Sequence, residues 1–264
     1  MNDHVTAPFF ARDGDHWHPS GMAKGPFGGL HGGAVSGLLV AELEALAASQ
    51  GWGRAVSATT YLVRPAPLQA MHTEWVPVRA GGRLSVIENQ LVADGKVQTK
   101  ASVCFLKDAA IAGLPDVEAA PDSFMATRDI DRLSAWEFQQ QRFFKESFLD
   151  AMDVRQGDGM VWVKPLHTLT GAAHPLSTVM SIADFSTLFY VVNDDKRPAA
   201  DGWPNADLSV HIARPPVGTW IGVKSRSSWH SHGTGLTESE LFDCAGWFGR
   251  SCQSVVLLPP RAAD

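Results

Sequence analysis

The segment Asp207-Leu-Ser-Val-His-Ile-Ala-Arg-Pro215 decides the fold, because a similar segment, Ser57-Ala-Thr-Thr-Tyr-Leu-Val-Arg-Pro65, stands 150 residues before it. Both segments alternate in polarity and end in Arg-Pro. The same offset, without a gap, aligns two further pairs of segments: Val35–Val40 with Phe185–Tyr190, and Ser102–Leu106 with Cys252–Val256. Any one pairing is weak evidence, but three in a single register indicate an internal duplication.

Each copy has the same order of elements, a long apolar helix followed by strands. In the first copy apolar residues recur on most faces of residues 30–48, which is typical of a buried helix. Turn signals such as Asp94-Gly95 separate the strands that follow. We expect first-copy strands over residues 54–64, 70–79, 83–93 and 96–107. In the second copy we expect a leading strand from Phe144 to Val154, a strand over 160–165, one helix over 175–193, and strands over 205–214, 218–228, 234–243 and 248–258.

The stretch between the copies carries Pro115, Pro121 and scattered acids and alanines. It predicts a linker over residues 111–140 with one short helix near Leu133–Gln141, between an N-terminal unit, 1–110, and a C-terminal unit, 141–264. One such unit would leave a sheet edge and a helix flank bare, so two are expected to pair. The sequence therefore predicts an α+β protein.

Composition excludes several classes of protein. The chain has 264 residues, 45% of them hydrophobic, and 22 Lys and Arg against 28 Asp and Glu, a net charge of -6. This charge argues against nucleic acid as a partner. We find no signal-peptide pattern, and Glu42 and Glu44 break the most apolar stretch, so we expect a soluble, cytoplasmic protein without a membrane partner. The three cysteines are expected to be reduced, buried, small hydrophobes: Cys104, Cys244 and Cys252.

The offset also shows where the copies differ. Three polar residues of the second copy stand where the first is apolar: Asp184 opposite Ala34, Asn205 opposite Ala55, and Gln253 opposite Val103. Each lies in a segment predicted to be buried, where an unpartnered polar group costs several kcal/mol. We therefore expect the chemistry in the second copy.

Taken together, the motifs resemble those of the double-hotdog acyl-CoA thioesterases, relatives of bacterial thioesterase II. The residues that carry the resemblance are Phe27-Gly-Gly-Leu-His-Gly-Gly33, Leu62-Val-Arg-Pro65, Asp184, the segment 207–215 and Gln253. The resemblance covers nearly the whole chain. It implies a double hotdog, in which two fused, helix-wrapped antiparallel sheets form one continuous sheet with both long helices packed on it.

The resemblance also implies a site and a reaction. It assigns catalysis to Asp184, Asn205 and Gln253, and implies hydrolysis of an acyl-CoA by water without a covalent intermediate, cofactor or metal. An ionised Asp184 can take a proton from water, while the two amides can hold that water or donate to an oxyanion. A backbone N–H at a helix N-terminus could polarise the thioester carbonyl. One departure is that relatives usually carry a hydroxyl residue where Asn205 stands.

His31, Gly32 and Gly33, at the start of the first helix, are expected to bind substrate, with His31 either lining the pocket or acting as a base. The resemblance further implies that double units associate into an oligomer. The spacing of His230 and His232 could suggest a metal, but without a third ligand nearby a solvated hairpin is the better interpretation.

Other interpretations stay open. Asp184 could cap a strand or pair with an Arg, Asn205 could serve a turn, and Gln253 could point outward. A second enzyme class is a hotdog hydratase or dehydratase acting on an enoyl- or hydroxyacyl-thioester, which needs His31 to face a carboxylate. A third class is a catalytically weak acyl-CoA binding protein. Convergence of Asp184, Asn205 and Gln253 on one water site would favour the hydrolase.

Overall fold

The computed structural model describes residues 7–115, 130–140, 146–157, 159–193, 198 and 200–260. Its first half contains β1 (Phe10–Asp13), β2 (His16–Pro19), η1 (Gly21–Ala23), α1 (Gly32–Gln50), β3 (Arg54–Leu62), β4 (Met71–Arg79), β5 (Leu84–Ala93) and β6 (Lys96–Leu106). Its second half contains η2 (Ile130–Arg132), β7 (Ser134–Ala135), α2 (Glu137–Gln140), β8 (Met152–Gly157), β9 (Met160–Pro165), α3 (Pro175–Ala183), α4 (Ser186–Asn193), β10 (Asp207–Ile212), β11 (Ile221–His230), β12 (Thr234–Asp243) and β13 (Gly246–Val256).

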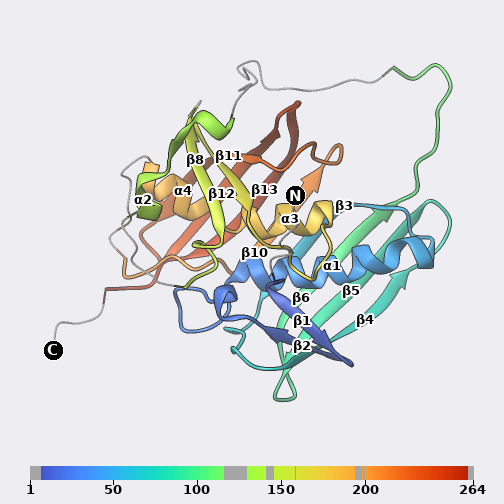
Figure 1. The fold of residues 1–264 in the computed structure, drawn as a ribbon, viewed down its shortest axis with the longest axis horizontal. Coiled ribbons are helices and arrows are strands. Elements are labelled where there is room, and N and C mark those ends of the chain that lie inside the picture. Colours follow the sequence, from blue (N-terminus) through green and yellow to red (C-terminus); the bar gives the residue numbers. More distant parts are fainter. Residues whose placement is uncertain are drawn as a thin grey trace.

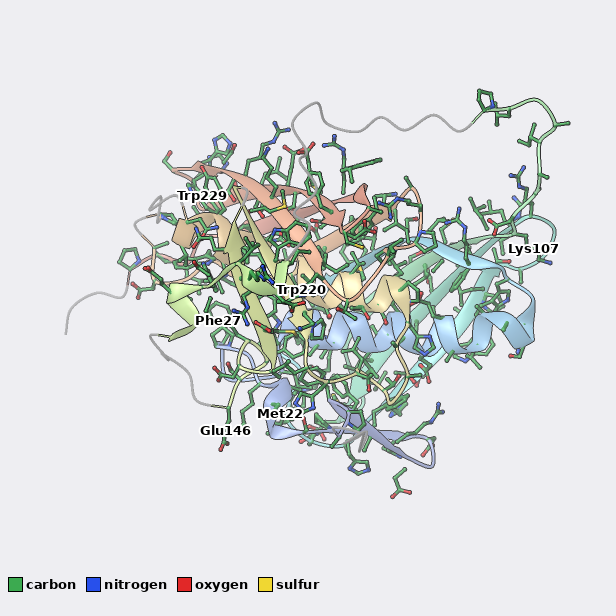
Figure 2. All side chains as sticks on the ribbon, turned by 45° about the horizontal axis from the view of Figure 1, so that its top comes forward. Met22, Phe27, Lys107, Glu146, Trp220 and Trp229 are labelled. Atoms are coloured by element: carbon green, nitrogen blue, oxygen red, sulfur yellow. The ribbon has the colours of Figure 1, made fainter. Side chains whose placement is uncertain are left out.

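The strands of the described residues form one 13-stranded antiparallel sheet in the order β1-β2-β4-β5-β6-β3-β10-β13-β12-β11-β9-β8-β7. The helices α1, α3 and α4 lie against this sheet (Figure 1). Core side chains fill the space between the layers (Figure 2). The α+β double hotdog with one continuous sheet is therefore confirmed.

The two halves meet where β3 pairs with β10, and the pairing is symmetric about Thr59 and Ser209. Their hydroxyl oxygens are 2.9 Å apart. The pairings on either side of the seam repeat at the offset of 150: Thr59 pairs with Ser102, and Ser209 pairs with Cys252. The halves are thus related by a pseudo-twofold axis through the seam.

The helices α1 and α3 approach each other closely at two glycines. A Cβ on Gly33 would overlap the carbonyl oxygen of Ser181 on α3, and one on Gly37 would lie 3.1 Å from the carbonyl oxygen of Ser177 on the same helix. Although α1 is long and apolar enough to cross a membrane by composition, 67% of that stretch is buried inside the protein. It is the central core helix of the first half.

The predicted helix over 175–193 is wrong in one respect, because the structure has two helices. They are bent by 42° where α3 ends at Ala183 and α4 begins at Ser186, which leaves Asp184 and Phe185 between them. Two side chains distant in sequence form hydrogen bonds to the backbone groups at this break, as described below.

Two predictions between the copies also need correction. Of the leading strand expected from Phe144 to Val154, Phe144 lies outside the described residues. The strand β8 begins at Met152, because residues 148–151 form a turn that buries Phe148 against His31 and Phe185. The helix expected near Leu133–Gln141 is reduced to α2, preceded by the short strand β7. Gln141 itself lies outside the described residues.

The cysteines are free, but the expectation that all are buried is wrong. Cys104 is partly buried, while Cys244 and Cys252 are exposed. Cys252 alternates with the inward-facing Ser251 and Gln253 on β13, so it points away from the core. Cys244 lies in the turn between β12 and β13.

Candidate active site

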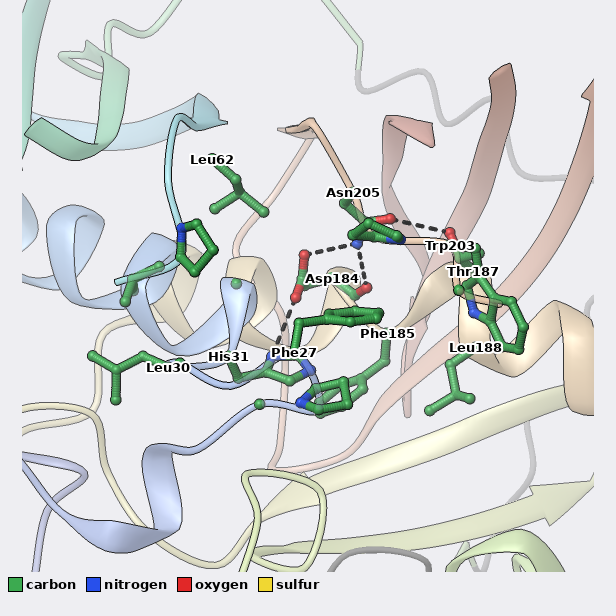
Figure 3. Close-up of a pocket in the computed structure, with 18 of the residues that line it drawn as sticks. Phe27, Leu30, His31, Leu62, Asp184, Phe185, Thr187, Leu188, Trp203 and Asn205 are labelled. Carbon is green, nitrogen blue, oxygen red and sulfur yellow. Dashed lines mark hydrogen bonds and ion pairs between the residues drawn. The ribbon is translucent and has the colours of Figure 1, made fainter. Parts of the chain in front are cut away.

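A cavity of about 650 Å³ lies where the start of α1 meets the break between α3 and α4. Most of its lining is apolar, as the close-up in Figure 3 shows: Phe27, Leu30, Leu62, Phe185, Leu188 and Trp203. Its polar lining includes His31, Asp184, Thr187 and Asn205. A largely apolar cavity with a few convergent polar groups is typical of a small-molecule site.

Asp184 occupies the break and is 7% exposed. One carboxylate oxygen, Oδ2, accepts the N–H of Gly33 at 2.6 Å, and Oδ1 accepts from Nδ2 of Asn205 at 2.9 Å. Among the described residues no Lys or Arg forms an ion pair with it. The hydrogen-bond donors to its carboxylate come from α1 and from Asn205. The carboxylate is therefore held by neutral donors beside an apolar cavity.

Asn205, half-buried, directs its amide nitrogen at Asp184. Nδ2 donates to both the backbone oxygen and Oδ1 of Asp184, each at 2.9 Å. Its own Oδ1 lies 3.3 Å from the hydroxyl oxygen of Thr187. The predicted neighbours Asp184 and Asn205 are therefore brought together at the cavity wall (Figure 3).

Gln253 is only 1% exposed and faces the core from β13. It is not among the described residues that line the cavity. Its amide lies 2.5 Å from the hydroxyl oxygen of Thr187, which separates it from the cavity. Gln253 thus belongs to the same network as Asp184 and Asn205, but in the layer behind them.

Thr187 connects these groups, and the sequence pattern did not single it out. Its hydroxyl also lies 3.0 Å from that of Thr237, which in turn lies 2.7 Å from that of Ser227. The offset of 150 contains the missing signal, because the first copy has nonpolar residues at all three equivalent positions: Gly37, Ile87 and Pro77. The polar difference between the copies is therefore wider than three residues.

His31 caps α1 and faces Asp184. Its Nδ1 lies 3.2 Å from Oδ2 of Asp184 and 3.1 Å from the N–H of Gly33. The ring packs between Phe148 and Phe185, with ring centroids 5.0 and 4.3 Å away. Burial lowers the pKa of His31, although the charge of Asp184 acts in the opposite direction. Burial of His31 therefore favours the uncharged imidazole.

Gly32 leaves room directly beside the carboxylate. A Cβ there would lie 2.9 Å from Oδ2 of Asp184 and 2.8 Å from Cδ1 of Leu62. As the first residue of α1, Gly32 has an N–H without an acceptor in its own helix. The N–H of Gly33 is already bonded to Asp184, whereas the N–H of Gly32 has no acceptor among the described residues and lies near the positive end of the helix dipole.

His230 and His232 lie in the β11–β12 hairpin, with their rings stacked at 5.4 Å. Both are exposed. Within the part of the chain that the structure describes, no three metal-ligating side chains cluster in a way that could hold an ion.

Comparisons with known proteins agree with this architecture. The family model for the acyl-CoA thioesterase N-terminal domain matches residues 19–106, and the model for the C-terminal domain matches residues 114–257. A search of curated protein sequences found no match.

Two solved structures illustrate the similarity of fold. A hotdog-fold protein of unknown function from Alicyclobacillus acidocaldarius is 18% identical, with a TM-score of 0.71 over 98% of both chains. An acyl-CoA thioesterase II from Mycobacterium marinum is 15% identical, with a TM-score of 0.63 over 95% of this chain and 94% of that one. With both halves of the chain matched by its models, this protein belongs to the acyl-CoA thioesterase family.

Proposed function

We propose that this protein hydrolyses an acyl-CoA to a free acid and CoA. Water attacks the thioester carbon directly, and Asp184 is the base that takes the proton from this water. The observation that carries the proposal is the buried carboxylate of Asp184, which lines an apolar cavity beside the free N–H of Gly32. A base and an oxyanion donor that line the same cavity are what acyl transfer to water requires.

The reaction follows from these groups. Asp184 takes a proton from water as the water oxygen bonds to the thioester carbon, and the carbonyl oxygen gains the negative charge. The N–H of Gly32 donates to this oxyanion. Collapse of the tetrahedral intermediate breaks the C–S bond, and the proton held by Asp184 passes to the CoA sulfur. Asn205 keeps the carboxylate oriented, because both hydrogens of its Nδ2 point at Asp184.

The cavity rim supplies groups suited to the phosphates of CoA. Lys24 and Arg64 line the cavity and are exposed, and no described carboxylate forms an ion pair with either. The equivalent of Arg64 in the second copy, Arg214, is instead bound at 2.6 Å to Asp243. The first copy has Ala93 opposite Asp243. Arg64 donates from Nη1 to the backbone oxygen of Val97 at 2.6 Å, and its charge has no carboxylate partner among the described residues, so it can bind an anion.

One observation favours a second candidate, a hydratase or dehydratase acting on an enoyl- or hydroxyacyl-thioester. His31 faces a carboxylate, with Nδ1 3.2 Å from Oδ2 of Asp184. Such a pair can add water across a double bond or remove it. Hydration would leave the thioester intact, so the two reactions give different products.

The experiment is an assay of free thiol with saturated acyl-CoAs of increasing chain length, alongside an assay of enoyl-CoA hydration. The proposal expects CoA release from at least one saturated acyl-CoA, and loss of that release in Asp184→Ala. Hydration of enoyl-CoA without thiol release would establish the second candidate instead. Binding of acyl-CoA without either reaction would mean a binding protein, and would overturn the proposal.

A further inference from the structure

The break between α3 and α4 frees backbone groups that a continuous helix would pair. In such a helix the N–H of Thr187 would bond to the oxygen of Ala183, and that of Leu188 to the oxygen of Asp184. Neither bond forms here, and the N–H of Phe185 makes a tighter bond to Ile182 at 3.0 Å. Buried backbone groups released in this way need other partners.

The amide of Gln253 stands in the gap. In the orientation that satisfies both backbone groups, its nitrogen donates to the oxygen of Ala183 at 3.3 Å and its oxygen accepts the N–H of Thr187 at 3.2 Å. These are the two groups that would otherwise bond to each other. A side chain inserted into the helical hydrogen-bond ladder is a known cause of sharp kinks.

Asn205 forms a hydrogen bond to the next backbone oxygen along the chain, that of Asp184. Its Nδ2 donates to the backbone oxygen of Asp184 at 2.9 Å, the acceptor that the N–H of Leu188 would use in a continuous helix. Together the two amides therefore partner three of the four backbone groups that these two helical hydrogen bonds would pair: the oxygens of Ala183 and Asp184 and the N–H of Thr187.

The first copy serves as an internal control. It has Val103 where the second has Gln253, and Ala55 where the second has Asn205. The helix α1 runs without interruption from Gly32 to Gln50. The fold therefore accepts apolar residues at both positions when the helix is continuous, and the amides occur only in the copy whose helix is broken.

We propose that Gln253 is a positioning residue whose amide holds the break between α3 and α4 open and thereby places the Asp184 carboxylate against Gly33 and the cavity. The inference rests on the proposed function for the role of Asp184. Its structural claim concerns only the geometry of the helix and can be measured without any substrate.

The test is Gln253→Val, which introduces the residue of the first copy. A crystal structure should show α3 and α4 joined by the bond from Thr187 N–H to Ala183, with the bend reduced from 42°. A carboxylate displaced by about 1 Å should lower kcat by about 10²-fold, with KM changed little. The matched control is Gln98→Val, which removes another buried amide that bonds to backbone oxygens, but on β6 away from the cavity. It should leave both the bend and kcat unchanged.

Two outcomes with Gln253→Val would overturn the inference. If the bend persists while kcat falls, Gln253 acts on the reaction directly, and if the helix straightens while kcat is kept, the break does not place Asp184. A wild-type protein that releases no CoA would refute the proposed function, yet leave the helix geometry measurable.

A second variant covers the case in which Gln253→Val does not fold. In Gln253→Glu a protonated carboxyl keeps one donor and one acceptor, whereas an ionised one cannot donate to Ala183. We expect kcat relative to wild type to be retained at low pH and to fall as pH rises. A ratio that is constant with pH would contradict the role of the amide donor.

Discussion

At the residue scale, Asp184 is a carboxylate whose partners in the described chain are neutral groups. The N–H of Gly33 and the amide of Asn205 orient it, and burial of His31 beside it favours the uncharged imidazole. Nothing cationic among the described residues offsets its negative charge. A base of this kind can take up a proton from water without first breaking an ion pair.

Asp184→Asn should lower kcat by about 10²- to 10⁴-fold, because the amide keeps the shape of the side chain but cannot accept the proton. Steady-state kinetics with the best acyl-CoA substrate measures this, and thermal unfolding checks that the variant is folded. Asp207→Asn, on the exposed side of β10, is the control. A kcat within threefold of wild type would remove Asp184 from the reaction.

Arg64→Ala should raise KM for acyl-CoA by about tenfold, since charge-assisted contacts to phosphate contribute about 1.5 kcal/mol or more. It should leave KM unchanged for the matching acyl-pantetheine, which lacks phosphates. The comparison of both substrates at low salt is the measurement. Arg79→Ala, on β4 outside the cavity lining, is the control. An equal rise in KM for both substrates would place Arg64 near the acyl or pantetheine part instead.

Part of this site could be predicted from residues alone. A polar residue opposite an apolar one at the offset of 150 marks Asp184, Asn205 and Gln253, and the structure places all three in one hydrogen-bonded network. Which of them faces the cavity could not be predicted, because that depends on the bend at Asp184. The same offset places Thr187 opposite Gly37, but a threonine in a helix indicates a role in the site only once its hydroxyl partners are known.

At the element scale, the contact between α1 and α3 sets the position of the site. The two helices approach at Gly33 and Gly37, and the carboxylate of Glu44 accepts the N–H groups of Leu176 and Ser177 at 3.0 and 2.8 Å. One helix thus caps the other at its N-terminus. Burial nevertheless raises the pKa of Glu44 to about 7, and the two N–H donors offset only part of this.

This pKa makes the stability of the fold depend on pH. The folded-state pKa lies above the value of 4.5 expected in the unfolded chain, so the folded state binds the proton more tightly. The resulting stabilisation is complete below pH 4.5 and is lost as pH rises through about 7, a change of at most about 3 kcal/mol.

Glu44→Gln should remove this dependence. Urea unfolding at several pH values between 4.5 and 8 measures it, as the difference in unfolding free energy between wild type and variant. The unfolding free energy of Glu44→Gln should increase relative to that of wild type as pH rises. The unfolding free energy of Glu88→Gln, at an exposed site on β5, should not change relative to wild type. A difference that does not change with pH would mean that Glu44 titrates normally.

Most elements could be predicted from alternation and turn signals, and β12 and β9 occupy the predicted ranges. The break between α3 and α4 could not, because residues 175–193 are mostly apolar and contain no proline or glycine after Pro175. Its cause lies in Gln253, 60 or more residues later in the chain.

At the scale of the whole molecule, the seam between β3 and β10 joins the copies into one sheet, and α1 crosses to contact α3. The cavity exists only because both halves contribute, with His31 and Leu62 from one and Asp184 and Asn205 from the other. A single copy of the fold would therefore not form this site, since the site depends on the interface between the copies.

The shared sheet predicts that both halves unfold together. Arg214→Leu leaves the carboxylate of Asp243, which is 0% exposed, without its bidentate partner, and breaking such a pair costs about 3 to 5 kcal/mol. Hydrogen exchange should show equal loss of protection on β5, in the first half, and on β12. The exposed Arg226→Leu is the control. Protection lost from β12 alone would show that the halves unfold independently.

Water is proposed to attack the thioester carbon directly, with Asp184 as the base and without an acyl-enzyme. A single-turnover reaction in H₂¹⁸O with enzyme in excess tests this most directly. We predict release of CoA and one ¹⁸O atom in the free acid, with no label in the protein, and turnover by Asp184→Asn that is slower by about 10²- to 10⁴-fold. Acid that carries no ¹⁸O after the first turnover, with the label found instead in the carboxyl group of Asp184, would contradict it, because the acyl group would then have passed through the enzyme.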